Sequence, residues 1–265
     1  MSTLSLPRPR LGTRPGTAPR AAFGQIVRNE VRLALRRPVG LIGGVALPIG
    51  LLIIFSQLPA FKQTLPGLGG DTIFAVYVPV LMCFGLGMLA LLGLPIPLVS
   101  YRELGVLRRL STTPVPPSWL LAAQGIVQLG TAVIMTVAII VISITVLGVP
   151  APKSPAGLVL SFLLAAAALF AIGLLISAVA RTSSAVNVIG RVTFFPLMFF
   201  AGLWLPRALM PDVLLNISNY TPLGATVQAV QDSMQTGFPP AAPLLVLAAY
   251  ALVFGLLARR FFRWE

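Results

Sequence analysis

The chain has 265 residues, of which 57% are hydrophobic and only 9% are charged, and its formal net charge is +13. Ordinary soluble domains carry roughly 25% charged residues, so a lipid bilayer is the expected solvent for this much apolar surface. With no histidine and a single cysteine, Cys83, the sequence excludes disulfides within the chain and cysteine–histidine nucleophile pairs, and no metal site is expected.

The N-terminal residues 1–20 are rich in proline, arginine, glycine, serine and threonine, and they contain no acidic residue. Such a segment has too few apolar groups to bury, which predicts a disordered cytoplasmic tail. A signal peptide is not expected, because no apolar run begins until after Arg37.

Residues 21–37 predict an amphipathic helix. On a helical projection Arg28, Arg32 and Arg36 fall on one face, and the apolar side chains fall on the other. This pattern favours the cytoplasmic membrane interface, where membrane lipid is a partner of the helix. A simple membrane anchor and a docking surface for another protein are both compatible with it.

Charge-poor stretches follow, each near the roughly 20 apolar residues that cross a bilayer. The predicted transmembrane helices are residues 39–56, 72–98, 119–148, 156–180, 184–205 and 241–258. The run 110–152 is long enough for two short spans, but its first residues, LSTTPVPPS, suit a membrane helix poorly, so one long span is expected. The predicted fold class is an all-α polytopic membrane protein with six transmembrane helices.

Basic residues divide unevenly between the two sides of this topology. Sixteen of the 19 lysines and arginines fall on the side of the termini, and only Lys62, Lys153 and Arg207 fall on the other. The positive-inside rule therefore predicts a multi-pass protein of the inner (plasma) membrane with both termini cytoplasmic. Most of the net charge is then explained by topology and lipid attraction, so nucleic acid is not expected as a partner.

A compact group of charges lies between the second and third predicted spans, where residues 102–110 predict a short helix on the cytoplasmic membrane surface. One side of this helix holds Arg102, Gly105, Arg108 and Arg109. The other side holds Leu104, Val106, Leu107 and Leu110. Glu103 falls inside the apolar arc, where an unpaired carboxylate is costly, so we expect it to have a partner, such as a basic residue of the 21–37 helix.

Two features lie in the C-terminal half. Arg191 is several residues inside the fifth span, which is expected to begin at Ser184; a charge there usually faces a cavity or partner, and extension to the cytoplasmic headgroups is the alternative. Residues 206–240 are too long for a simple turn and too apolar for open solvent. They predict a short extracellular helical re-entrant segment before the last span, with Asn219 or Thr221 as a cap.

These residues together resemble one known family. ELGVLRRL, which begins at Glu103 and is followed by Thr113-Pro114, is similar to the first cytoplasmic loop of type-2 ABC transporter permeases. Asn29-Glu30 and the arginines after it resemble the amphipathic start of the same family. Val106 replaces the usual threonine, and Tyr101 stands where many relatives carry a second acid. The composition resembles the subgroup that exports drugs and antibiotics such as daunorubicin.

The resemblance implies that residues 21–265 are the transmembrane domain of an exporter for an amphiphilic small molecule, drug or lipid. It also implies a separate ABC ATPase subunit that holds ATP and Mg²⁺, with residues 102–110 as the coupling helix that docks on it. The chain has no phosphate-binding loop of the form G-x-x-x-x-G-K-[ST], so neither an enzyme nor a bound cofactor is expected. Six spans are too few to enclose a large pathway, which predicts a dimer with a second permease copy or homologue.

Two other classes stay open from the sequence. A secondary transporter or channel would be favoured by inverted repeats or by ionisable groups at the bilayer midplane. A polytopic membrane enzyme would need paired acids or a serine–lysine dyad within the spans, whereas the six acidic residues lie at or near the span ends.

Overall fold

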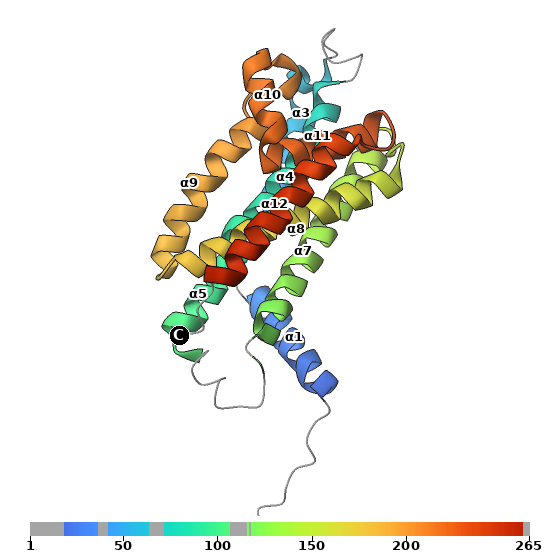
Figure 1. The fold of residues 1–265 in the computed structure, drawn as a ribbon. Coiled ribbons are helices and arrows are strands. Elements are labelled where there is room, and N and C mark those ends of the chain that lie inside the picture. Colours follow the sequence, from blue (N-terminus) through green and yellow to red (C-terminus); the bar gives the residue numbers. More distant parts are fainter. Residues whose placement is uncertain (1–18, 37–41, 64–71, 107–115, 117, 262–265) are drawn as a thin grey trace, which may run out of the picture.

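The structure is a computed structural model that describes residues 19–36, 42–63, 72–106, 116 and 118–261, and every regular element in these parts is a helix (Figure 1). Five helical stretches are long and apolar enough to cross a membrane. They are Ile73–Glu103 (α4, η4 and α5), Ser118–Thr145 (α7), Pro155–Val179 (α8), Ser183–Ala201 (α9) and Ala241–Phe261 (α12). The predicted all-α membrane fold is therefore confirmed for the described residues. The first of the six predicted spans is a shorter apolar helix, Ile42–Gln57.

The N-terminal helix α1 (Pro19–Arg36) packs against α7. Phe23 of α1 and Trp119 of α7 meet edge to face, with ring centroids 5.6 Å apart. The three arginines of the predicted basic face are exposed, and Leu35 is exposed as well, as expected for a side chain that contacts lipid. The predicted amphipathic helix thus exists, although it begins inside the predicted tail; residues 1–18 lie outside the described residues.

The first apolar helix starts irregularly. Its opening turn η1 (Ile42–Ala46) is a π-helix, α3 (Leu47–Gln57) continues it, and the 3-10 turn η2 (Pro59–Lys62) follows. A Cβ on Gly44 would lie 2.3 Å from Leu89 Cδ2. The glycine therefore allows this turn to press directly against the second span.

The second span is the centre of the bundle, because it contacts α3, α7, α8 and α9. It consists of α4 (Ile73–Met88), the π-helical turn η4 (Leu89–Gly93) and α5 (Pro95–Glu103). Pro95 has no N–H, and its ring would clash with the carbonyl four residues earlier, which favours a wider turn at this point. Accordingly, the Leu94 N–H donates to Leu89 O, five residues back, at 2.8 Å. The helix then continues beyond the predicted end at residue 98.

Two glycines from neighbouring spans cover the π-helical turn η4. A Cβ on Gly173 of α8 would lie 2.1 Å from Ala90 O, and a Cβ on Gly190 of α9 would lie 2.9 Å from Leu91 O. Small residues at such contacts let helix backbones approach closely, which is a main source of helix association in lipid. The widened turn is thus held from both sides by glycine.

We expect Gly173→Ala to lower the thermal stability of the detergent-purified chain. The added methyl group meets a backbone carbonyl that cannot rotate away, and overpacking of this kind costs about 1–3 kcal/mol. Gly255→Ala in α12 is the matched control, since a Cβ there meets nothing within 4 Å. Equal melting temperatures for the two variants, measured by size-exclusion chromatography after heating, would contradict the close contact at Gly173.

The fifth span differs from its predicted bounds at both ends. Thr182, rather than Ser184, caps α9, because Thr182 Oγ1 accepts a hydrogen bond from the Ala185 N–H at 3.1 Å. The helix ends at Ala201, four residues before the predicted end, because Gly202 adopts the left-handed conformation with φ +93°. Glycine takes this conformation without the steric penalty of a side chain, and it commonly ends helices in this way.

Residues 206–240 are mostly helical, as expected for the predicted segment before the last span. After η5 (Arg207–Leu209) come α10 (Asp212–Tyr220) and α11 (Pro222–Gln235). Thr221 caps α11, with its Oγ1 accepting from the Gly224 N–H at 3.1 Å. α11 is largely buried against α4, α8, α9 and α12. The insertion of this pair into the outer leaflet stays a prediction.

The connections gather at two opposite ends of the bundle (Figure 1). α1, the end of α5 and the end of α12 lie at one end. At the other end, the Lys153 and Ser154 N–H groups donate to Met234 O and Ser233 O, at 3.3 and 3.0 Å, so the α7–α8 loop lies beside α11. The structure therefore separates the basic end of the molecule from the end that carries Lys153 and Arg207.

Candidate functional site

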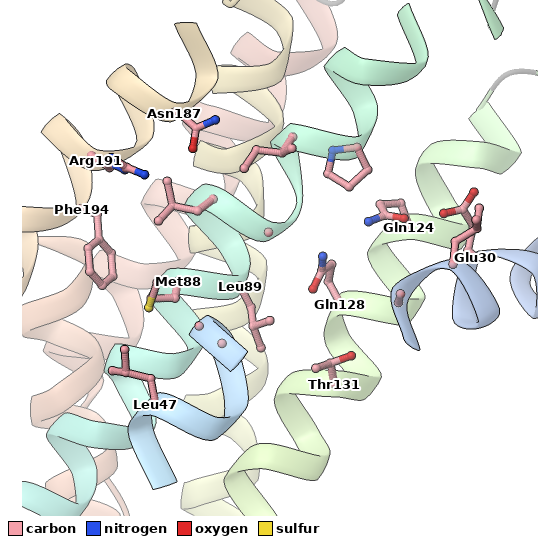
Figure 2. Close-up of a pocket in the computed structure, with 18 of the residues that line it drawn as sticks. Glu30, Leu47, Met88, Leu89, Gln124, Gln128, Thr131, Asn187, Arg191 and Phe194 are labelled. Atoms are coloured by element: carbon pink, nitrogen blue, oxygen red, sulfur yellow. The ribbon is translucent and has the colours of Figure 1, made fainter. Parts of the chain in front are cut away.

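A cavity of about 980 Å³ lies between α1, the start of the first apolar helix, the second span, α7 and α9 (Figure 2). Most of its lining residues are apolar, and the second span contributes more of them than any other element. This apolar part includes Phe84, Met88, Leu89, Leu92, Ile96 and Pro97. Apart from Tyr101 near the end of the second span, the polar lining residues come from the surrounding helices, so the cavity combines an apolar floor with polar groups on its walls.

The wall formed by α7 carries Gln124, Gln128 and Thr131 (Figure 2). Their spacing of four and three residues places them on one face of the helix. Gln124 is only 4% exposed, while Thr131 Oγ1 donates to Val127 O at 2.8 Å. We did not predict this wall from the sequence, although the spacing of polar residues inside an otherwise apolar span is a signal that could have revealed it.

The wall formed by α9 carries Asn187, Arg191 and Phe194, again at a spacing of four and three residues (Figure 2). Asn187 Nδ2 donates to Ser183 O at 3.0 Å, which leaves the amide oxygen available. Arg191 is exposed and lines the cavity. The structure thus places this arginine where the cavity hypothesis puts it, and its role in binding stays a prediction.

Glu30 of α1 reaches the last turns of the second span at the edge of the same cavity. The Tyr101 hydroxyl lies 2.8 and 3.0 Å from the two carboxylate oxygens of Glu30 and donates to them. Both side chains are buried. The Tyr101 phenol therefore gives Glu30 a hydrogen-bond donor and ties α1 to the second span.

Arg102 and Glu103, the last two residues of α5, cap two different helices; we call them the cap pair. Arg102 Nη2 donates to Ala180 O and, at 3.3 Å, to Ser177 O at the C-terminal end of α8. Glu103 Oε1 accepts from the Ser183 N–H at 3.0 Å, and its Oε2 accepts from the Ser183 hydroxyl. A cation at a helix C-terminus and an anion at a helix N-terminus both complement the helix dipole.

Several predictions for residues 102–110 are wrong within the described part. The helix is not continuous, because α5 ends at Glu103 and Gly105 turns the chain with φ +65°. Arg102 consequently points to α8 instead of outward, and Glu103 is exposed and pairs with Ser183 rather than with the 21–37 helix. Leu104 is 68% exposed and does not hold the segment against the core. The remaining predicted contact residues, Leu107, Arg108, Arg109 and Leu110, lie outside the described residues.

Arg207 forms a second polar centre at the opposite end of the bundle. It is only 8% exposed. Its Nη1 donates to Ser218 Oγ at 2.5 Å and to Gly224 O at 2.8 Å, and its Nη2 donates to Asn219 Oδ1 at 2.5 Å and to Gln228 Oε1 at 3.4 Å. In the sequence this arginine stands out only as one of three basic residues on the predicted external side. Its polar centre could not be predicted, because the acceptors around Arg207 come from α10 and α11.

Burial and charge act in opposite directions on this arginine. Burial lowers the pKa of Arg207, and the nearby Asp232 carboxylate counteracts that shift. Burial raises the pKa of Asp232, and the Arg207 guanidinium counteracts it in turn. The two groups thus support each other's charged forms at the corner between α9, α10 and α11.

Comparison with models of protein families covers most of these elements. A family model described as ABC-2 type transporter matches residues 21–235, which include the cavity walls, the cap pair and the Arg207 centre. Among curated proteins, none matches the chain. Together with its apolar membrane helices, the match shows that this chain belongs to the ABC-2 type transporter family, the membrane components of ABC transporters.

Proposed function

We propose that the chain is the transmembrane permease subunit of an ATP-driven exporter that moves an amphiphilic small molecule, drug or lipid across the cytoplasmic membrane. The observation that carries this proposal is the cavity of about 980 Å³ with its apolar floor and polar walls. Pockets for small molecules fall roughly between 300 and 1,000 Å³, so a drug-sized amphiphile fits this space. Its apolar part would contact the second span, and its polar part would contact α7 or α9.

The energy source is a separate ABC ATPase subunit, which would bind ATP and Mg²⁺ and dock at the end of the bundle that carries α1 and the cap pair. Two features of the described residues support this end as the docking surface: the exposed arginines of α1 and the exposed Arg181 between α8 and α9. In the sequence, Arg108 and Arg109 follow the cap pair within six residues. Charges at the rim of an interface mainly guide orientation and association. The cap pair would then carry the movement of the docked loop into α8 and α9.

A second permease copy or a homologue would complete the pathway. The cavity lies partly open, because lining residues such as Arg191 and Phe195 are exposed. A single bundle therefore does not enclose a substrate along its whole path. The outward side chains of α12, including Leu245, Leu252 and Leu256, are 65–67% exposed and suit contact with membrane lipid.

The proposed topology places both termini in the cytoplasm. Single cysteines at positions 62, 153 and 211, in a chain whose buried Cys83 is replaced by alanine, should react with an impermeant thiol reagent added to intact cells. A cysteine at position 108 should react only after the membrane is opened. Labelling of position 108 from outside would overturn the topology.

Transport by the complex tests the function directly. The chain and its ATPase subunit, reconstituted in vesicles, should accumulate a fluorescent amphiphile in the presence of ATP and lose this activity when the ATPase cannot hydrolyse ATP. Three fluorescent probes cover the main classes of amphiphile. Ethidium is the cationic probe, a dye with an alkyl chain is the anionic probe, and a labelled phospholipid is the lipid probe. Absence of ATP-driven movement for every such amphiphile would count against the proposal.

Arg191→Ala should reduce export of the anionic probe while the ATPase subunit stays bound. The guanidinium lines the cavity and can attract an anionic headgroup, whereas alanine leaves the α9 wall without a positive charge. Lys153→Ala is the control, because Lys153 is also an exposed basic residue, does not line the cavity and lies at the end of the bundle opposite the proposed docking surface. Unchanged export by the Arg191 variant would leave only an interaction with lipid headgroups for this residue.

A further inference from the structure

Two amides on the α7 wall have no hydrogen-bond partner among the residues that the structure describes. The Gln124 side chain is only 4% exposed, and Gln128 is partly buried. Both residues line the cavity (Figure 2). A buried amide is unfavourable unless its donors and acceptor are satisfied. Neither amide is among the fully buried polar atoms that lack a partner in the described part of the chain, so both amides are accessible from the cavity, where water or a bound molecule can be their polar partner.

The chemistry of the wall selects the kind of partner. A carboxamide presents N–H donors and a carbonyl acceptor side by side. Neighbouring hydroxyl groups can both donate to it and accept from it, whereas a sulfate or phosphate offers only acceptors and an ammonium group only donors. Glu30 lines the same cavity from α1, which packs against α7, and its carboxylate disfavours an anion near this wall.

The surroundings of Gln128 keep its amide available to such a group. A Cβ on Gly93 would lie 3.2 Å from Gln128 Nε2, so the absence of a side chain at this position leaves the amide uncovered on the side of the second span. Leu89 and Leu92 line the same cavity and offer an apolar surface next to the amides. The wall thus presents hydrogen-bonding groups directly beside a place for an alkyl or ring system.

From this arrangement we propose that Gln124 and Gln128, with Thr131, bind the neutral, hydroxyl-rich part of the transported amphiphile, such as a glycosyl headgroup. The inference rests on the proposed export function and names the substrate class for the same cavity. It assigns the two walls different tasks: α7 selects neutral polyhydroxyl groups, and Arg191 of α9 tolerates or attracts anionic ones.

Binding can be measured on the full chain in lipid nanodiscs by titration calorimetry, with empty nanodiscs subtracted. The probes share a decyl chain and differ in the headgroup: decyl maltoside, decyl sulfate and decylammonium, each below its micelle-forming concentration. We expect Gln124→Leu and Gln128→Leu each to weaken binding of decyl maltoside by about tenfold. Binding of decyl sulfate should stay unchanged, which also shows that the variants are folded.

Gln57→Leu is the matched control, because Gln57 is exposed at the end of α3 and lies outside the cavity. If Gln124→Leu does not fold, Gln124→Met keeps the length of the side chain and gives the same comparison. Equal affinity of wild type and both cavity variants for decyl maltoside, or equal losses for all three headgroups, would overturn the inference. In either case ATP-driven transport by the wild-type complex would still support the export function, and only failure of transport would count against that.

Discussion

Arg207→Ala is expected to destabilise the protein more than any other single substitution at the end of the bundle formed by α10 and α11. The buried guanidinium donates four hydrogen bonds that join η5 to α10 and α11. Alanine leaves Gly224 O and the Ser218 and Asn219 side chains without this donor, and it removes the charge that supports ionised Asp232. Losing a buried, hydrogen-bonded charge of this kind costs about 3–5 kcal/mol.

The measurement is the melting temperature of the detergent-purified chain, which we expect to fall by about 10 °C. Arg207→Lys should lie between wild type and alanine, since an ammonium keeps the charge but does not reproduce the planar fork of donors. Lys153→Ala is the control at the same end, because Lys153 is exposed and its contact to Met234 uses only the backbone. A melting temperature of Arg207→Ala equal to that of Lys153→Ala would show that the polar centre does not hold this corner together.

The long apolar helices could be predicted from the sequence because a bilayer imposes both their length and their helical form. Every backbone polar group must be satisfied within a span, so a charge-poor run of about 20 residues has few alternatives to a helix. Errors are concentrated at the ends, where single residues decide. Gly202 ends α9 early, and Glu103 rather than residue 98 ends the second span.

The site was harder to predict because it depends on which helices become neighbours. Arg191 attracted attention as an isolated charge, and the structure places it on the cavity wall. Gln124 and Gln128 carry no charge, and only the packing of α1 and α7 beside the second span turns them into part of a cavity. Gly105 is the source of a different error. The helical projection of residues 102–110 requires one continuous helix, and Gly105 interrupts that helix with a left-handed backbone conformation.

The contacts of the cap pair give a different physical reason for the proposed coupling role of Glu103 from the one that the sequence suggested. The sequence suggested a carboxylate buried in an apolar arc, yet Glu103 is exposed and binds the N-terminus of α9. Arg102 meanwhile binds the C-terminus of α8, and Ser100 Oγ lies 3.1 Å from Ser183 Oγ. The end of the second span is therefore joined to both sides of the short α8–α9 turn, directly before the loop proposed to dock on the ATPase.

We expect Glu103→Ala to uncouple ATP hydrolysis from transport while the ATPase subunit remains bound. A docked loop can bias the spans only through groups that move together, and without the carboxylate the Ser183 backbone N–H at the start of α9 loses its acceptor on the second span, so that only the Ser100–Ser183 hydroxyl contact remains there. Export per ATP hydrolysed should fall by about tenfold, within the usual range of coupling between sites. Arg109→Ala, which removes one rim charge, should do less damage.

Reconstituted vesicles give both quantities, the substrate-stimulated ATPase rate and the export rate. Ser183→Ala removes the hydroxyl partner of Glu103 but keeps the backbone N–H, so its effect should be smaller than that of Glu103→Ala and should not add to it in the double variant. Additive losses would mean that the two residues act separately, and Glu103 would then have another partner in the working transporter. If Glu103→Ala instead exports as much per ATP as wild type, the charged turn serves only as a topology signal, because positive-inside sorting requires arginines and places no demand on this carboxylate.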